Sequence, residues 1–205
     1  MAAMMDVMIS MIFGGILLFI VVSANDIAVE NQAVYNGDML VQEMLTATVQ
    51  LLEGELRNMG FGVPENVPTI LTADTSTIVF LTVLNRTATV PDTVRYFIGD
   101  TTDLSGTQNE RDRLLYRRVN SEKVLSVGTV TVFHLDYITK SGEDLATPVD
   151  PGRLAEIHVV DVTIEVQNPH APYRDANTVK AGQRNALYSS SMWQQTRLAS
   201  QNSQR

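Results

Sequence analysis

The hydrophobic pattern begins with nineteen residues that carry no charged side chain. They run from Val7 to Asn25, VMISMIFGGILLFIVVSAN, between Asp6 and Asp26. At about 1.5 Å per residue, a helix over this stretch spans roughly 28 Å, which is close to the hydrocarbon thickness of a bilayer. Because the stretch is apolar on every face, it predicts a single membrane-spanning helix.

Two other interpretations of this stretch are weaker. A buried core helix of a soluble domain is less favoured, because the stretch lies at the extreme N-terminus and is apolar on every face. A secretory signal peptide would have a basic start, a shorter apolar run and an Ala-x-Ala-like cleavage site, whereas MAAMMD has no Lys or Arg. We therefore expect residues 1–25 to be a retained transmembrane anchor.

The helical pattern continues beyond the span, but there the apolar residues lie on one face of the helix only. Apolar residues recur at three- and four-residue steps, as an amphipathic helix requires. They include Ile27, Val34, Val41, Met44, Leu45, Leu52, Leu56 and Met59. We expect Leu45, Leu52 and Leu56 to be buried against a sheet, and Glu43, Glu53 and Arg57 to face solvent or a neighbouring subunit. The pair Asn36-Gly37 predicts an interruption, and Gly60, Gly62 and Pro64 predict the end of a helix over about residues 4–59.

Residues 70–167 have the composition of β-strands. Five segments stand out: Thr77–Leu84, Thr93–Ile98, Leu114–Val119, Val130–Ile138 and Ile157–Val166. The first is nearly continuously apolar, as in a central strand covered on both faces, and the second is expected to pair with the third. Because no second helical pattern separates them, they predict one antiparallel meander under the helix, an α+β fold.

Alternation within the last two segments predicts which side chains face the core. The inward set is Phe133, Leu135, Tyr137, Val160, Val162, Ile164 and Val166, and the outward set is Val132, His134, Asp136, Asp161, Thr163 and Glu165. Ile157 and Val159 are out of phase with their neighbours. Either a β-bulge lies near Val159-Val160, with Ile157 inward and His158 at the surface, or His158 faces the core.

The pattern divides the chain into four parts. They are an anchor (1–25), an amphipathic continuation of the helix (26–62), a sheet domain (63–167) and a polar tail (168–205). The tail is rich in Asn, Gln, Ser and Arg, and much of it has the composition of loop or disorder. Within it, Ala186–Leu198 carries the single tryptophan, and we expect Trp193 to anchor a final edge strand.

Charge and composition narrow the possible partners. The net charge is −8, with seven acids and one base in residues 1–60, fifteen and nine in 61–167, and one and five in 168–205. An acidic body argues against a nucleic-acid partner. The absence of cysteine excludes disulfides and thiolate metal sites. Six residues without Lys or Arg precede the span, so we expect the larger domain to be extracytoplasmic and the span to lie in the inner (cytoplasmic) membrane.

Catalytic motifs are missing from the sequence. The histidines are His134, His158 and His170, and no HExxH, GxSxG, P-loop or GxGxxG pattern accompanies them. His134 and Asp136 share a strand face, which is more typical of a solvated surface than of a catalytic pair. Acidic loops with Asp100 and Asp103, or with Glu143, Asp144 and Asp150, could offer oxygens to calcium but match no EF-hand. The sequence therefore predicts no enzyme, catalytic residue, metal site, cofactor or small-molecule substrate.

The order of these parts resembles the type IV pilin class. An apolar N-terminal helix continues into an amphipathic one, stops at GELRNMGFG (residues 54–62) and is followed by a sheet. The succession LLYRRV, VTVFHLDYITKSGE, AEIHVVDVTIEVQ and a Ser/Thr-rich end with an arginine is similar to W-type minor pilins and J-type minor pseudopilins of type II secretion. The strand-turn with Leu135, Tyr137 and Ser141-Gly142 is also similar, although Asp136 is displaced from the family's position.

One departure from the family lies at the N-terminus. Pilin-like proteins carry a short basic leader that ends in glycine, is cut before a Phe, and is followed by a glutamate at the fifth mature position. This sequence shows neither the basic leader nor the Gly-Phe site, but Asp6 becomes the fifth residue if Met1 is removed. The resemblance implies a pilin-like fold, partners among other pilin-like subunits through N-terminal helices, and contact with the lipid bilayer.

Assembly residues are predicted near the start of the helix. In a bundle of such helices, Asp6 could pair with the α-amino group of a neighbour, although in an isolated helix it would simply reach water. Gly14-Gly15 would admit a close helix approach or merely local flexibility. We expect subunit contacts at Asp6, Phe13, Gly14, Gly15 and Leu17.

Three functions are compatible with these patterns. The favoured one is a membrane-anchored minor pilin or pseudopilin that assembles into an extracytoplasmic filament. The alternative is a single-span accessory or binding subunit of a larger membrane complex that forms no filament. A tethered hydrolase using His134 or His158 is the third, and it would need a pocket joining a histidine to a nucleophile.

Overall fold

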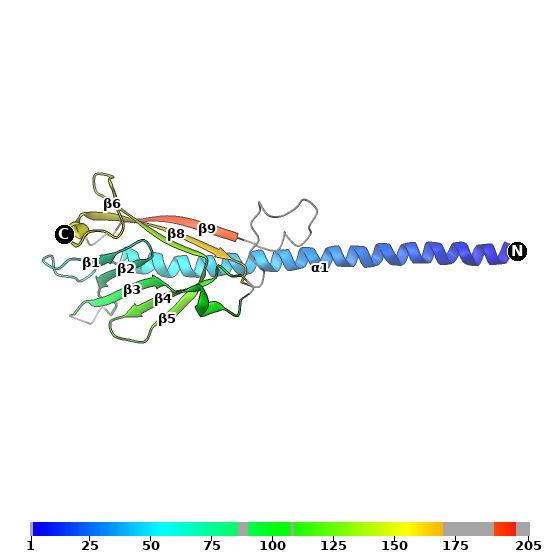
Figure 1. Cartoon of the computed structure of the whole chain (residues 1–205), viewed down its shortest axis with the longest axis horizontal. Coiled ribbons are helices and arrows are strands. Elements are labelled where there is room, and N and C mark those ends of the chain that lie inside the picture. The colour runs from blue at the N-terminus through cyan, green and yellow to red at the C-terminus, as the bar shows by residue number, and fades with distance from the viewer. Residues whose placement is uncertain (1, 86–89, 108, 170–190, 200–205) are drawn as a thin grey trace.

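The chain folds into one very long helix and a two-sheet domain at its C-terminal end (Figure 1). The structure is a computed structural model, and it describes residues 2–85, 90–107, 109–169 and 191–199. Helix α1 (Ala2–Arg57) has 56 residues, about 84 Å at the usual rise. Its N-terminal half extends far beyond the domain (Figure 1).

The predicted interruption at Asn36-Gly37 is wrong, because α1 runs through it unbroken. A glycine inside a helix costs only about 1 kcal/mol relative to alanine, and the turns on either side outweigh it. The predicted end is confirmed: α1 stops at Arg57, and Gly60 and Gly62 follow with φ of 79° and 71°. A side chain at Gly62 would also collide with Val83, because its Cβ would lie 2.6 Å from Val83 Cγ2.

The strands form two antiparallel sheets where the sequence predicted one. The first has the order β1-β2-β3-β4-β5, and its strands are β1 (Ile70–Ala73), β2 (Thr77–Thr82), β3 (Asp92–Ile98), β4 (Arg113–Val119) and β5 (Leu125–Val130). The second has the order β7-β6-β8-β9, with β6 (Val132–Thr139), β7 (Asp144–Leu145), β8 (Ile157–Gln167) and β9 (Ser191–Ala199). Two short 3₁₀ helices, η1 (Thr101–Leu104) and η2 (Pro151–Glu156), lie in the connections.

The break between the sheets falls at one residue that the pattern did not reveal. Thr131 separates β5 from β6, and its N–H and hydroxyl both donate to the carbonyl of Glu165, at 2.8 and 3.2 Å. The predicted strand Val130–Ile138 therefore crosses a sheet boundary. The predicted pairing of the second and third segments is confirmed, because β3 pairs with β4.

The C-terminal half of α1 lies between the two sheets (Figure 1). Its buried side chains and the inward side chains of both sheets form a single core. The helix contributes Val41, Leu45, Val49, Leu52, Leu56 and Met59. The burial predicted for Leu45, Leu52 and Leu56 is thus confirmed, as is the inward set of the last two predicted strands.

Three details of the second sheet refine the predictions. The register between β6 and β8 skips His158, so the β-bulge is confirmed one residue before its expected place; Ile157 is buried and His158 is half-buried. Asp161 faces outward as expected but is only 3% exposed, because β9 lies beside β8 and the Arg197 side chain covers its carboxylate. Trp193 lies on β9, an edge strand, and its side chain points away from the core at 68% exposed.

Candidate assembly surface

The N-terminal half of α1 exposes an unbroken apolar surface. From Met4 to Val22 every described side chain is exposed, and fifteen of them are large and apolar. Within the described residues, α1 is the one helix long and apolar enough to cross a membrane, and none of its most apolar window is buried. This half of the helix therefore fits a single-pass membrane anchor.

Water alone is an unfavourable environment for this surface. Burying a large apolar side chain stabilises it by about 1.5–3 kcal/mol, so fifteen such side chains correspond to tens of kcal/mol. The surface must be covered by lipid or by other apolar helices.

The predicted contact residues lie within this surface. Phe13 and Leu17 are each 62% exposed. An added Cβ at Gly14 or Gly15 would meet nothing within 4 Å, so packing inside the chain does not require a glycine at either position. Asp6 is exposed near the start of the helix, and its carbonyl accepts a hydrogen bond from the Ser10 hydroxyl at 2.8 Å. These residues follow one another along a single segment of α1 over about three turns.

A partly buried ion pair joins the other half of α1 to the first sheet. The Arg117 guanidinium on β4 donates to both Glu55 oxygens, with Nη2 to Oε1 at 2.6 Å and Nε to Oε2 at 2.9 Å. The Tyr96 hydroxyl on β3 donates to the same carboxylate at 2.5 Å. Burial, and then the hydrogen bond to Glu55, raise the pKa of Tyr96, while the hydrogen bond to Glu55 raises the pKa of Arg117. Three elements thus meet at one carboxylate.

This ion pair escaped the sequence reasoning, although a signal for it was present. Leu115 and Val119 are buried on β4, and Arg117 lies between them on the same face. A charged side chain at an inward strand position needs a partner, since an unpaired buried charge is costly. The alternation of LLYRRV therefore predicts an acid opposite Arg117, but it does not say which one.

The histidines and acidic loops assemble no catalytic or metal site within the described residues. His134 Nε2 lies 3.1 Å from Asp136 Oδ1, and both side chains are about half exposed. A hollow of about 690 Å³ includes His158 and Ser141, but the Ser141 hydroxyl is hydrogen-bonded to Thr139 at 2.8 Å. His170 lies outside the described residues.

Four of the five acidic side chains that were considered for calcium have other partners, and the fifth, Asp144, is exposed. Asp103 accepts from the Tyr116 hydroxyl at 3.2 Å. Asp100 caps η1 and accepts from the Thr102 N–H at 3.0 Å, which lowers its pKa. Asp150 caps η2, and Glu143 pairs with Arg153 at 3.1 Å. No three acidic or histidine side chains of the described ranges come together as metal ligands.

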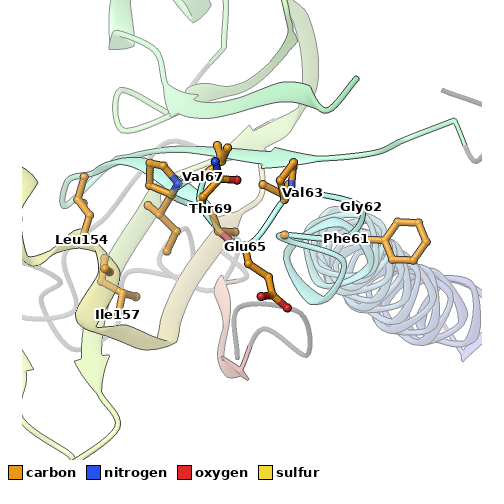
Figure 2. A pocket seen from close by; sticks show the side chains of 14 residues that line it. Phe61, Gly62, Val63, Glu65, Val67, Thr69, Leu154 and Ile157 are labelled. Carbon is orange, nitrogen blue, oxygen red and sulfur yellow. The ribbon is translucent and has the colours of Figure 1, made fainter. Parts of the chain in front are cut away.

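The loop after α1 forms a cavity with one side of η2 and the start of β8 (Figure 2). Its volume is about 660 Å³, and it is lined by residues 60–70 together with Leu154, Ala155 and Ile157. Glu65 is its one charged lining residue. Figure 2 shows Glu65 apart from Leu154 and Ile157, and Phe61 pointing away from the other labelled side chains. A single carboxylate without a second charged side chain in the lining defines no acid–base pair.

Comparisons with known proteins do not define a family. No family model matches the chain. No curated protein matches it either. Among solved structures, the chain is similar to a type IV-like pilin, TTHA1219 from Thermus thermophilus, with 10% identity, 80% of this chain and 98% of that chain covered, and a TM-score of 0.49. A TM-score this low carries no assignment.

Proposed function

We propose that this chain is a membrane-anchored, pilin-like structural subunit that joins an extracytoplasmic filament by packing its N-terminal helix against those of neighbouring subunits. The observation that carries the proposal is the contrast within α1. One half is fixed in the core, and the other half presents apolar side chains all round. A helix of this kind lies in lipid before assembly and among other apolar helices afterwards.

The resemblance of the sequence to W-type minor pilins and J-type minor pseudopilins supports a role as a minor subunit of a pilus or of a type II secretion pseudopilus. In this proposal the domain is extracytoplasmic and the span starts in the inner membrane. The neighbours contact Phe13, Gly14, Gly15 and Leu17. Asp6 neutralises the α-amino group of an adjacent subunit, because a charge that enters an apolar bundle unpaired is costly.

The test compares Asp6→Ala with Asp26→Ala at the other end of the span. Both aspartates are exposed in the single chain, and both variants lose one negative charge. At matched membrane abundance, Asp6→Ala should co-purify poorly with its partner subunits, whereas Asp26→Ala should co-purify like the wild type. Equal recovery of the two variants would remove Asp6 from the mechanism.

Electron microscopy of the purified assembly separates the filament from the alternative accessory subunit. Helices bundled along a fibre axis support the proposal. A particle with a detergent belt around a single span would identify a tethered subunit that forms no filament.

A further inference from the structure

The first sheet carries its charge as arginine. Among its strand residues, β1 to β5 contain one acid, Asp92, and four arginines, Arg95, Arg113, Arg117 and Arg118. Arg117 faces inward to Glu55. Arg95 and Arg118 lie directly opposite each other on the outward face. In the part of the chain that the structure describes, neither of these two forms an ion pair.

Aromatic rings complete this outward face. The Arg95 guanidinium lies 4.7 Å from the centre of the Phe97 ring, and that ring lies 5.3 Å from the ring of Tyr116. Like charges directly opposite in a sheet are destabilising. Asp103 reaches this face, where it accepts from the Tyr116 hydroxyl at 3.2 Å, but among the described residues it forms no ion pair with either arginine. An anionic group from outside the chain would offset the repulsion between the two guanidinium groups. We name Arg95, Arg118, Phe97 and Tyr116 the basic face.

The second sheet has the opposite charge on its outward side. Its strands contain four acids and one arginine, namely Asp136, Asp144, Asp161, Glu165 and Arg197. Arg197 pairs with Asp161 at 3.0 Å and Arg111 pairs with Glu165 at 3.9 Å, whereas Asp136 and Asp144 remain exposed. Trp193 is the register partner of Glu165 and is largely exposed beside it. We name Asp136, Asp144 and Trp193 the acidic face.

The two faces point away from each other. The inward sides of both sheets meet α1 in one core, so the outward sides lie on different sides of the domain (Figure 1). Two surfaces on opposite sides of one chain cannot meet within that chain, but they can meet between copies.

We propose that the basic face of one copy docks on the acidic face of the next copy. The opposite charges of the two faces attract each other. Without such a contact, copies that each carry a net charge of −8 would repel one another. The exposed Trp193 ring is suited to stack against a guanidinium of the basic face. Because the two surfaces differ, the contact is head-to-tail and not a symmetric pairing of identical surfaces.

This inference rests on the proposed function in one respect: helices gathered side by side supply the high local concentration that a weak contact between charged faces needs. The helix surface and the sheet faces are otherwise separate parts of the molecule, so each can fail without the other.

Trp193 offers a direct readout, because it is the only tryptophan. The full chain is reconstituted in lipid vesicles at increasing protein density, and its emission is recorded. For the wild type, the emission maximum should move to the blue as density rises and return as salt is raised from roughly 0.05 to 0.5 M, because salt screens exposed charges.

Two charge-reversal variants make the test specific. Arg95→Glu/Arg118→Glu turns the basic face acidic, and Asp136→Arg/Asp144→Arg turns the acidic face basic. Each variant alone should lose the blue shift, because its two faces then carry the same sign. An equimolar mixture should recover the shift, because each variant complements the other. As a control, Arg57→Glu reverses one charge on α1, outside both faces, so it should behave as the wild type.

Recovery in the mixture also shows that both variants are folded. A shift that persists in either variant alone, or that fails to return in the mixture, overturns the proposal. If the Trp193 emission behaves as expected while Asp6→Ala co-purifies normally, the contact between the sheet faces is supported and the proposed pairing of Asp6 is wrong. If Asp6→Ala is defective and no wild-type shift occurs, the helix contact stands alone.

Discussion

Leu52 and Leu17 belong to one continuous helix, yet Leu52 is 1% exposed and Leu17 is 62% exposed. In the C-terminal half of α1, the apolar stripe has two sheets to pack on, and the other face is polar. In the N-terminal half, side chains of similar chemistry surround the whole helix and have nothing of this chain to contact. Leucine therefore stabilises the fold in the C-terminal half of α1. In the N-terminal half it is available for contact with lipid or with another helix.

The largest expected effect separates these two leucines. Leu52→Ala should lower the free energy of unfolding of the domain by about 2–5 kcal/mol, because it leaves a cavity in the core. Leu17→Ala should leave it unchanged, since no domain residue packs there. Denaturant unfolding of the detergent-solubilised chain, followed by near-ultraviolet circular dichroism, measures both. Similar losses in the two variants would mean that the halves are not independent.

A second comparison uses two glutamates of the C-terminal half. Glu55→Gln weakens the contacts with Arg117 and Tyr96 inside the domain, so it should cost about 1–3 kcal/mol of unfolding free energy. Glu53 pairs with Arg57 at 3.5 Å on the surface, so Glu53→Gln should cost at most about 0.5 kcal/mol.

The same unfolding measurement decides this comparison. An equal, small effect of both substitutions would show that the Glu55 carboxylate does not fix the helix to the sheet. In that case apolar packing alone would hold the C-terminal half of α1 in place.

The two halves of α1 were also unequally accessible to prediction. An apolar run of helical length indicates a membrane span without any knowledge of what the helix contacts. Apolar residues at three- and four-residue steps indicated the buried face of α1, and alternation indicated the buried faces of β6 and β8. The patterns could not show what each face packs against. Strand β5, LSVGTV, contains Gly128 and polar residues, and a single residue separates it from β6. It was therefore missed, and with it the second sheet.

The assembly surface was predicted as a stretch rather than as a set of contacts. Sequence indicated that residues 7–25 must be covered, and exposure in the structure agrees with this. Which side chains touch a neighbour depends on the neighbour, and its sequence is not part of this chain. The ion pair of Glu55 and Arg117 was missed for a related reason: its members are 62 positions apart, and periodicity reports only local neighbours.

The smallest expected effect concerns glycines that are structurally alike in the two halves. Gly14, Gly15 and Gly54 are all inside α1, and an added Cβ at any of them meets nothing within 4 Å. In a helix interior, alanine is favoured over glycine by about 1 kcal/mol. Gly54→Ala should therefore raise the unfolding free energy of the domain by up to about 1 kcal/mol, as denaturant unfolding would show.

Gly14→Ala/Gly15→Ala should leave that unfolding free energy unchanged and instead reduce co-purification with partner subunits. Small residues let helix backbones approach closely in an apolar environment, and two methyl groups would hold neighbouring helices apart. The Gly54→Ala variant is the matched control, because it adds the same group to the same helix where no neighbouring span would lie. Undiminished recovery of the Gly14→Ala/Gly15→Ala variant would mean that neighbouring helices do not approach each other at these glycines. The contact would then have to be sought on the faces that carry Phe13 and Leu17.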